Sequence, residues 1–255
     1  MKMKVINKML LLAILVLFAA MQAAAFNPEN RFDLLLQDGE KLPKYGEDSV
    51  NCVINISLYS EFYKQWKASD QTSQSIEEVF KPWRWVFKNC PIGSENTYVN
   101  GVNIYQYRIE NEKDKAKKEK YIDTLMMIYD QRVQYFPDHY KTGRPQVGSI
   151  LGRKGIDLYI YAPDRYEDTY NTLKKSIELD GNASDGTVLI YYFRSVIKMA
   201  RKSKIDSTAI VDAYDKTIDI LDYNIKGLEA AGDTRWAENY KNFKGNIDAT
   251  FEPFA

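Results

Sequence analysis

Two cysteines carry the most direct chemistry in this 255-residue sequence. Cys52 and Cys90 are the only cysteines, and their spacing is not that of a Cys-X-X-Cys redox motif. In an exported protein two cysteines most simply form a disulfide, although two buried free thiols, or a redox or metal function, stay open as alternatives. A bridge suits an antiparallel pair formed by the predicted helices Val50–Trp66 and Ile76–Cys90, because Cys52 would lie at the start of the first helix and Cys90 at the end of the second. It would enclose 37 residues and stabilise the pair by about 3–4 kcal/mol in the chain-entropy model.

The sequence offers few residues for catalysis or metal binding. His139 is the only histidine, and we expect it on the surface of the loop 138–144. One histidine and two distant cysteines do not make a usual zinc site, and no GxSxG, P-loop, HExxH or GxGxxG motif occurs. Glu77 and Glu78 are paired carboxylates, but acids near a helix start are favoured by the helix dipole alone. We therefore predict no enzymatic activity, no metal site and no cofactor. A carboxylate pair that faces a pocket, with a strongly raised pKa, would revive the enzyme hypothesis.

The segment KPWRW places two tryptophans next to an arginine. Adjacent residues on a helix point about 100° apart, so Trp83 and Trp85 cannot both be buried in the same way. An exposed Trp85 beside Arg84 could stack on a sugar or hold a side chain of a partner. The alternative is that Trp83 lies in the core and Trp85 packs on the preceding helix.

Residues 1–25 predict a secretory signal peptide. Three lysines precede the apolar run Met9–Met21, and the alanine-rich stretch ending at Ala25 fits a cleavage site. A transmembrane anchor is the alternative, but the run is short for a membrane span. We expect an exported protein of the periplasm or cell envelope, with cleavage near Ala25 and no membrane-spanning segment afterwards. Residues 26–49 are predicted to be an irregular leader, since they are polar and contain proline and glycine.

The charge balance argues against a general nucleic-acid binder. The whole chain has 35 basic and 35 acidic residues. The first 25 residues contain three lysines and no acid, so the remainder has 32 basic and 35 acidic residues, a net charge of −3. A nucleic-acid-binding protein would carry a basic excess. The run Lys115–Lys120 is expected to be the solvated start of a helix.

Helical periodicity of apolar residues runs through the remainder of the chain, residues 50–255. The predicted helices are Val50–Trp66, Ile76–Cys90, Asn96–Glu112, Asp114–Phe136, Gln146–Tyr161, Tyr166–Gly181, Ser184–Arg201, Ser207–Ile225 and Thr234–Ala249. They form four pairs and one last helix. The chain then ends in an apolar tail, either folded back as a plug or followed by further repeats.

A repeat with a period of about 45 residues connects the second helices of these pairs. It consists of an acidic residue, a mostly small residue and a bulky one. The acidic members are Glu78, Asp123, Asp168 and Asp212, at spacings of 45, 45 and 44 residues. Such a period is typical of a stacked helical array. The predicted fold class is therefore all-α, an α-solenoid of antiparallel helix pairs.

The window Tyr166–Asn182 resembles the second helix of a tetratricopeptide repeat. Thr169 and Ser176 occupy its small positions, Leu173 its aromatic or apolar position, and Gly181 its closing position. The usual period of that family is about 34 residues, and HEAT-type repeats are the structural competitor at about 45. With the phrases KPWRWVFKNCP and LGRKGIDL, the chain resembles exported tetratricopeptide-like proteins of Bacteroidetes. The resemblance implies a tetratricopeptide-like helical repeat domain over residues 50–255.

The expected function is that of an exported scaffold that binds a protein or peptide in the cell envelope. Helical arrays present a concave groove lined by the first helix of each pair. The alternative is a carbohydrate-binding helical protein of a glycan-uptake system, suggested by the tyrosine and tryptophan content of an exported chain. The candidate partner-binding residues are Tyr59, Tyr63, Trp85, Tyr105, Tyr159 and Tyr192.

Overall fold

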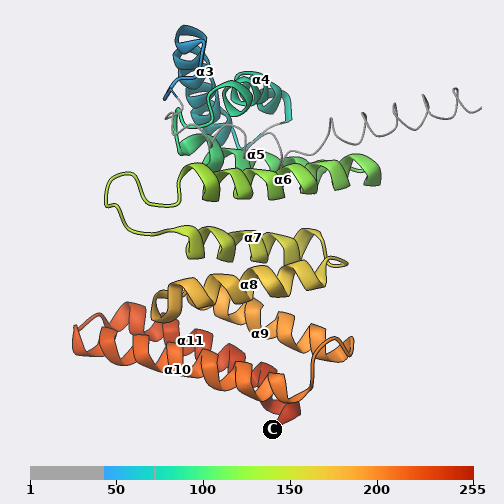
Figure 1. Cartoon of the computed structure of the whole chain (residues 1–255), viewed down its shortest axis with the longest axis vertical. Helices are drawn as coiled ribbons and strands as arrows, with labels where there is room; N and C mark the ends of the chain where they lie inside the picture. Colours follow the sequence, from blue (N-terminus) through green and yellow to red (C-terminus); the bar gives the residue numbers. More distant parts are fainter. Residues whose placement is uncertain (1–42, 72) are drawn as a thin grey trace, which may run out of the picture. The chain divides into compact units, whose positions relative to one another are not determined.

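The computed structural model describes residues 43–71 and 73–255, and the side chains of 72–74 are not described. The predicted signal peptide and all but the end of the predicted leader lie outside this range. The described part is all-α, with nine α-helices in sequential antiparallel pairs and no β-strand, which confirms the predicted fold class (Figure 1). The helices are α3 (Ser49–Ala68), α4 (Ser73–Asn89), α5 (Asn96–Asn111), α6 (Lys115–Tyr135), α7 (Val147–Tyr161), α8 (Tyr166–Asp180), α9 (Gly186–Arg201), α10 (Thr208–Ala230) and α11 (Thr234–Phe251).

Local sequence signals explain most of the helix boundaries. Aspartates cap four helix N-termini by accepting a backbone N–H of the first turn: Asp48 at α3, Asp114 at α6, Asp185 at α9 and Asp233 at α11. Gly181 ends α8 with a φ of +51°, a conformation that favours glycine, as its predicted closing position requires. The clearest difference is α10, which continues to Ala230 instead of ending at Ile225.

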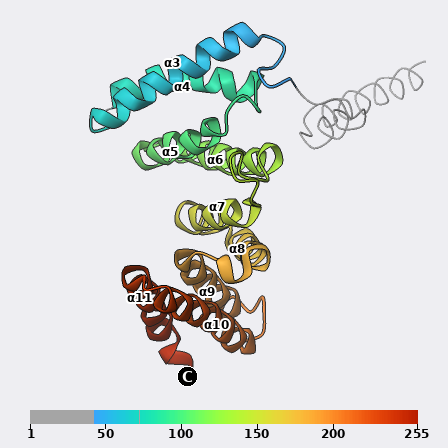
Figure 2. The ribbon, with the colours of Figure 1, turned by 90° about the vertical axis from the view of Figure 1, so that its left-hand side faces the viewer.

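The first helix of each pair contacts the first helix of the next. Asn103 of α5 donates to the Tyr63 hydroxyl of α3 at 2.9 Å, and Gln106 of α5 donates to Asp157 of α7 at 3.0 Å. The Tyr159 ring of α7 lies 5.1 Å from the Tyr191 ring of α9, measured between centroids. The pairs therefore follow one another in chain order, as a stacked array requires (Figures 1 and 2).

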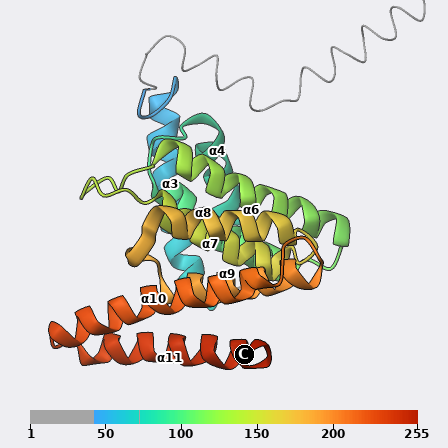
Figure 3. The same cartoon turned by 60° about the horizontal axis from the view of Figure 1, so that its bottom comes forward.

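The last three helices pack as a group. We expected α9 and α10 to form the fourth pair, but α10 packs more extensively against α11 than against α9 (Figure 3). The α9 helix contacts α8, α10 and α11. Gly186 permits the close approach of α11, since a Cβ there would lie 2.0 Å from Cδ2 of Phe243. Within this group, the Phe251 ring at the end of α11 stacks on the Tyr214 ring of α10, with 4.0 Å between the ring centroids.

Two buried hydrophobic clusters stabilise the array. The first runs from Cys52 to Ala162 and the second from Leu173 to Ile247. Small residues of the repeat lie where neighbouring helices meet: Thr169 is 2% exposed and Ser176 is 1% exposed. The Ser176 hydroxyl donates to the backbone oxygen of Gly148 at 2.7 Å, which ties α8 to the start of α7.

One face of α7 consists of glycines at helical spacing. Gly148, Gly152 and Gly155 lie on the side that meets α8 and α9. A Cβ at Gly155 would lie 2.5 Å from Cγ of Leu173, and one at Gly152 would lie 2.7 Å from Cγ2 of Val188. These glycines let α7 approach its neighbours closely. The contact between α7 and α8 is the most extensive of any helix pair in the described part.

Adding a methyl group to this face should destabilise the protein. We expect Gly155→Ala to lower the free energy of unfolding by about 1–3 kcal/mol, because the new methyl collides with fully buried Leu173. Gly227→Ala in α10 is the matched control, since nothing lies within 4 Å of a Cβ there. Its higher helix propensity should raise the free energy of unfolding by up to about 1 kcal/mol. Urea unfolding followed by circular dichroism measures both, and equal effects would contradict the close packing of α7.

Candidate functional site

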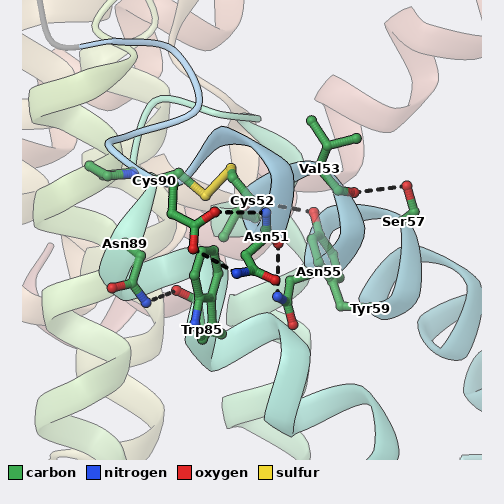
Figure 4. Close-up of a disulfide and its surroundings, with 12 residues drawn as sticks. Asn51, Cys52, Val53, Asn55, Ser57, Tyr59, Trp85, Asn89 and Cys90 are labelled. Carbon is green, nitrogen blue, oxygen red and sulfur yellow. Dashed lines mark hydrogen bonds between the residues drawn. A yellow bond between two sulfur atoms is a disulfide. The ribbon is translucent and has the colours of Figure 1, made fainter.

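A disulfide joins the start of α3 to the end of α4. The sulfurs of Cys52 and Cys90 are bonded at 2.12 Å, the Cα atoms lie 6.3 Å apart, and both residues are fully buried (Figure 4). Cys52 lies in the first turn of α3, and Cys90 directly follows α4. The predicted bridge is thereby confirmed, together with the antiparallel arrangement on which the prediction depended.

The α3 helix is apolar on two opposite sides. One side contains the fully buried Cys52, Tyr59 and Trp66. The other side, here called the apolar face of α3, contains Val50, Val53, Ile54 and Leu58, with exposed fractions of 69%, 46%, 47% and 43%. The sequence analysis did not identify this second apolar side. The available signal was a second apolar stripe at positions 50, 54 and 58.

A groove between α3 and α4 adjoins the apolar face. It has a volume of about 440 Å³. Its apolar lining is Leu58, Phe62, Pro82 and Trp85, and its polar lining is Asn55, Glu77, Glu78 and Lys81. The groove therefore combines a tryptophan ring with charged groups of both signs.

The two tryptophans of KPWRW have different environments. Trp83 is 1% exposed, and its Nε1 donates to the backbone oxygen of Thr97 at 2.7 Å. Trp85 is half-buried and lines the groove beside the disulfide (Figure 4). Trp83 therefore belongs to the core, and the ring of Trp85 is the one that a ligand can reach.

Three of the six candidate partner-binding residues lie in the core. Tyr59 is 0% exposed, Tyr105 is 6% exposed and Tyr192 is 7% exposed. Their rings pack on other helices. The free energy gained by burying an aromatic ring exceeds the cost of burying its single hydroxyl when that hydroxyl has a hydrogen-bond partner or lies at the edge of the core. The Tyr59 hydroxyl, for example, lies 3.3 Å from the Thr97 hydroxyl. A partner that docks on this conformation cannot contact these rings.

The other three candidates are half-buried. Trp85 lines the α3–α4 groove, whereas Tyr63 and Tyr159 lie at the junctions between first helices. The structure does not bring Tyr63, Trp85 and Tyr159 into one site.

A buried carboxylate lies at the contact between α5, α6 and α7. Asp157 is 5% exposed. Gln106 donates to both of its oxygens at 3.0 Å, and the Tyr129 hydroxyl donates to Oδ2 at 2.7 Å. The adjoining cavity measures about 160 Å³ and is also lined by Arg132 and Arg153. This volume lies below the roughly 300–1,000 Å³ of typical ligand sites. These three hydrogen bonds connect α5, α6 and α7, so we assign Asp157 to the positioning of those helices.

Burial shifts the pKa values of this network upward. Desolvation raises the pKa of Asp157, while the hydrogen bonds from Tyr129 and Gln106 act in the opposite direction. Desolvation, followed by the nearby charge of Asp157, raises the pKa of Tyr129. The negative charge of Glu110 adds to the shift of Asp157, but Glu110 does not line the cavity. The cavity therefore does not contain the carboxylate pair that would revive the enzyme hypothesis.

The raised pKa of Asp157 predicts a specific pH dependence of stability. The folded protein binds this proton more tightly than the unfolded chain, whose ordinary pKa is 3.8. The stabilisation is therefore complete below pH 3.8 and is lost as the pH rises through the folded pKa. We expect the unfolding free energy of the natural protein, minus that of Asp157→Asn, to fall as the pH rises above 3.8. Urea titrations at a series of pH values measure this difference.

Asp48→Asn provides a control of opposite sign. Hydrogen bonds from Asn51 lower the pKa of Asp48, so its contribution is present above the unfolded pKa and is lost as the pH falls. The corresponding difference for Asp48→Asn should rise with pH. A difference for Asp157→Asn that is flat with pH would show that burial does not shift this carboxyl.

Metal binding and membrane insertion find no support among the described residues. Within residues 43–71 and 73–255, no group of three or more histidine, cysteine or acidic side chains is placed to bind a metal ion. None of the described helices is long and apolar enough to cross a membrane. His139 is half-buried, and its Nδ1 lies 3.2 Å from the Thr142 hydroxyl within its own loop.

Comparison with known proteins does not identify a family for this chain. No protein-family model, curated protein or solved structure matches it.

Proposed function

We propose that this protein is an exported helical-repeat scaffold that binds a protein or peptide partner in the cell envelope and carries out no catalysis. The observation that supports the proposal most directly is the apolar face of α3. Four large aliphatic side chains are exposed there within nine residues, next to the α3–α4 groove. Contiguous exposed apolar surface on a folded protein is typical of an interaction site.

The groove suits an extended or helical peptide segment. Leu58 and Phe62 can receive an apolar side chain from the partner, and Trp85 provides a large aromatic anchor. Glu77, Glu78 and Lys81 form a charged rim that can fix the orientation of the partner. The disulfide holds the ends of α3 and α4 together, so the groove is ordered before binding and little further entropy is lost.

The disulfide also supports export. Stable disulfides form in oxidising compartments such as the bacterial periplasm and are rare in the cytosol. This agrees with the signal peptide predicted from residues 1–25.

The groove provides one argument for the carbohydrate-binding alternative. A half-buried tryptophan beside two carboxylates and an amine resembles the mixture of ring and polar groups that binds sugars. The aliphatic residues of the apolar face do not belong to such a site. They favour a protein or peptide, and the carbohydrate alternative becomes an outcome of the test.

Site-specific photocross-linking tests the proposal. A photoreactive amino acid is placed at Leu58 and, as a matched control, at Leu179 of α8, which is exposed to a similar extent. The full chain is incubated with its own cell-envelope extract, irradiated and analysed by mass spectrometry. We expect one dominant protein to be linked at position 58 and not at position 179. Leu58→Asp should weaken binding of the purified partner by about tenfold or more, because a charge replaces an apolar contact.

The outcomes separate the two candidate functions. The same set of products from both positions would contradict a partner site on α3. If no protein is enriched and a glycan array shows binding that Trp85→Ala abolishes, the carbohydrate alternative replaces the proposal.

A further inference from the structure

The α9 helix contains a run of cations without acids. Residues 186–205 include five basic residues and no acidic residue, although the whole chain has equal numbers of each. Four of them lie on one side of the helix or just beyond its end: Arg194, Lys198, Arg201 and Lys202. The sequence analysis did not identify this run, but its charge pattern was visible in the sequence.

These four side chains line the same groove. Its volume is about 510 Å³, and its other lining residues are Tyr159, Ile197, Thr250, Pro253 and Phe254. Among the described residues, no carboxylate lines it. None of the four cations forms an ion pair with a carboxylate of the described residues, in contrast to the neighbouring Lys204, which pairs with Glu167 at 2.9 Å. We name it the basic groove of α9.

Aromatic rings and a carbonyl position the cations. Lys198 donates from Nζ to the backbone oxygen of Pro163 at 2.5 Å, and Arg194 donates to Asn246 Oδ1 at 3.2 Å. The guanidinium of Arg194 lies 5.7 Å from the Tyr191 ring centroid, and that of Arg201 lies 5.8 Å from the Phe254 ring centroid. These neighbours are neutral. The positive charge of the groove is therefore not compensated by the groups that hold it.

The helix dipole explains only part of this pattern. Basic residues in the last turn of a helix interact favourably with its C-terminus, which applies to Lys198 and Arg201. Arg194 lies about two turns before the end of α9, outside the reach of that effect. It nevertheless lines the same groove, together with residues of α7 and of the tail.

We propose that the basic groove of α9 binds an acidic segment of a protein partner. Arg194 and Lys198 are separated by about 6 Å along the helix axis, at 1.5 Å per residue. Side chains on one side of an extended peptide recur at about 6.6–6.8 Å, so two carboxylates of such a peptide match these two cations. Ile197, Pro253 and Phe254 provide apolar contact for the intervening parts of the peptide.

Sugars and nucleic acids fit the groove less well. A neutral or charged sugar would bind by stacking on aromatic rings, but cations already lie over Tyr159, Tyr191 and Phe254. A nucleic acid would meet a chain whose formal net charge is zero. An acidic peptide is short enough to interact only with the positive charge of the groove, so the net charge of the whole chain does not oppose its binding. The inference rests on the proposed function in one respect, namely that the ligand is a protein segment, but it concerns a different surface.

Fluorescence anisotropy with defined peptides tests this site. The probe is a fluorescein-labelled twelve-residue peptide that alternates Glu and Thr, and its control alternates Gln and Thr. The double variant Arg201→Gln/Lys202→Gln removes two exposed cations that form no hydrogen bond or ion pair with other described side chains. The matched control is Lys115→Gln/Lys117→Gln, which removes the same charge from the exposed start of α6.

We expect the full chain to bind the Glu peptide and not the Gln peptide, with weaker binding at 300 mM than at 30 mM salt. The Arg201→Gln/Lys202→Gln variant should weaken binding by about fivefold, and the control variant should leave it unchanged. Equal binding of the two peptides, or an equal effect of the two variants, would overturn the proposal. Stronger competition by a sulfated glycan than by the unlabelled Glu peptide would assign the groove to carbohydrate and would also overturn it.

One further variant separates this inference from the proposed function. Leu58→Asp should not change binding of the Glu peptide, because Leu58 belongs to the groove of α3 and α4. Loss of cross-linking at Leu58 with intact peptide binding would reject the α3 site alone. Intact cross-linking without peptide binding would reject the basic groove alone.

Discussion

Reduction of the Cys52–Cys90 disulfide is expected to lower the unfolding free energy of the α3–α4 pair by about 4 kcal/mol. The bridge spans a sequence separation of 38 residues, for which the chain-entropy model gives this value. The effect should be local, because each pair of a helical array contacts only its neighbours. The same loss is expected for the double variant Cys52→Ala/Cys90→Ala.

Hydrogen exchange measured by mass spectrometry can detect this local effect. Oxidised and reduced protein should differ in protection over α3 and α4 and agree over α10 and α11. The cysteine-free variant is the control, since a reductant should leave its exchange unchanged. A loss of protection that is equal in all helices, or a difference below about 1 kcal/mol, would contradict a local stabilisation by the bridge.

Trp83→Ala is expected to lower the unfolding free energy by about 3–5 kcal/mol. The Trp83 ring is 1% exposed and stacks on the Phe87 ring at a centroid distance of 5.0 Å. Its removal leaves a large cavity and deprives the backbone oxygen of Thr97 of its donor. Gly101 of α5 lies against this ring, and it has no side chain that could fill the space left by the variant.

Two further variants separate the contributions to this loss. Trp83→Phe keeps much of the packing and removes the donor, so it should cost about 1–3 kcal/mol. Trp236→Ala replaces a tryptophan that is 54% exposed, and it should change the unfolding free energy by less than about 0.5 kcal/mol. Urea unfolding followed by circular dichroism measures all three. Similar values for Trp83→Ala and Trp236→Ala would show that Trp83 is not part of the core.

The sequence predicted the helices well because each has its own periodic apolar face. All nine predicted helices are present, and most boundaries agree within two residues. The end of α10 was less predictable, since Gly227 lowers the helix propensity of its last turns. The packing of α10 mainly against α11 could not be predicted from periodicity. Periodicity shows that α10 has an apolar face, but not whether that face packs mainly on α9 or on α11.

The candidate site was less predictable for a physical reason. A tyrosine at a periodic position can face either the core or a groove, because its ring gains from burial and its hydroxyl tolerates water. Tyr59 and Tyr63 both follow the apolar period of α3, but one is fully buried and the other is half-buried. The helical period alone did not distinguish between the two apolar sides of α3. The disulfide selects one of them, since Cys52 must face α4.

The disulfide has a consequence for a scaffold under mechanical tension. If a bound partner pulls on the chain, an unfolding helix pair lengthens by up to about 3.4 Å per residue. For the segment enclosed by Cys52 and Cys90, with its sequence separation of 38, that extension would be about 130 Å. The covalent bond removes this extension, because force passes from Cys52 to Cys90 directly. The α3–α4 pair therefore acts as a stiff link that keeps the groove between these two helices while later helix pairs unfold.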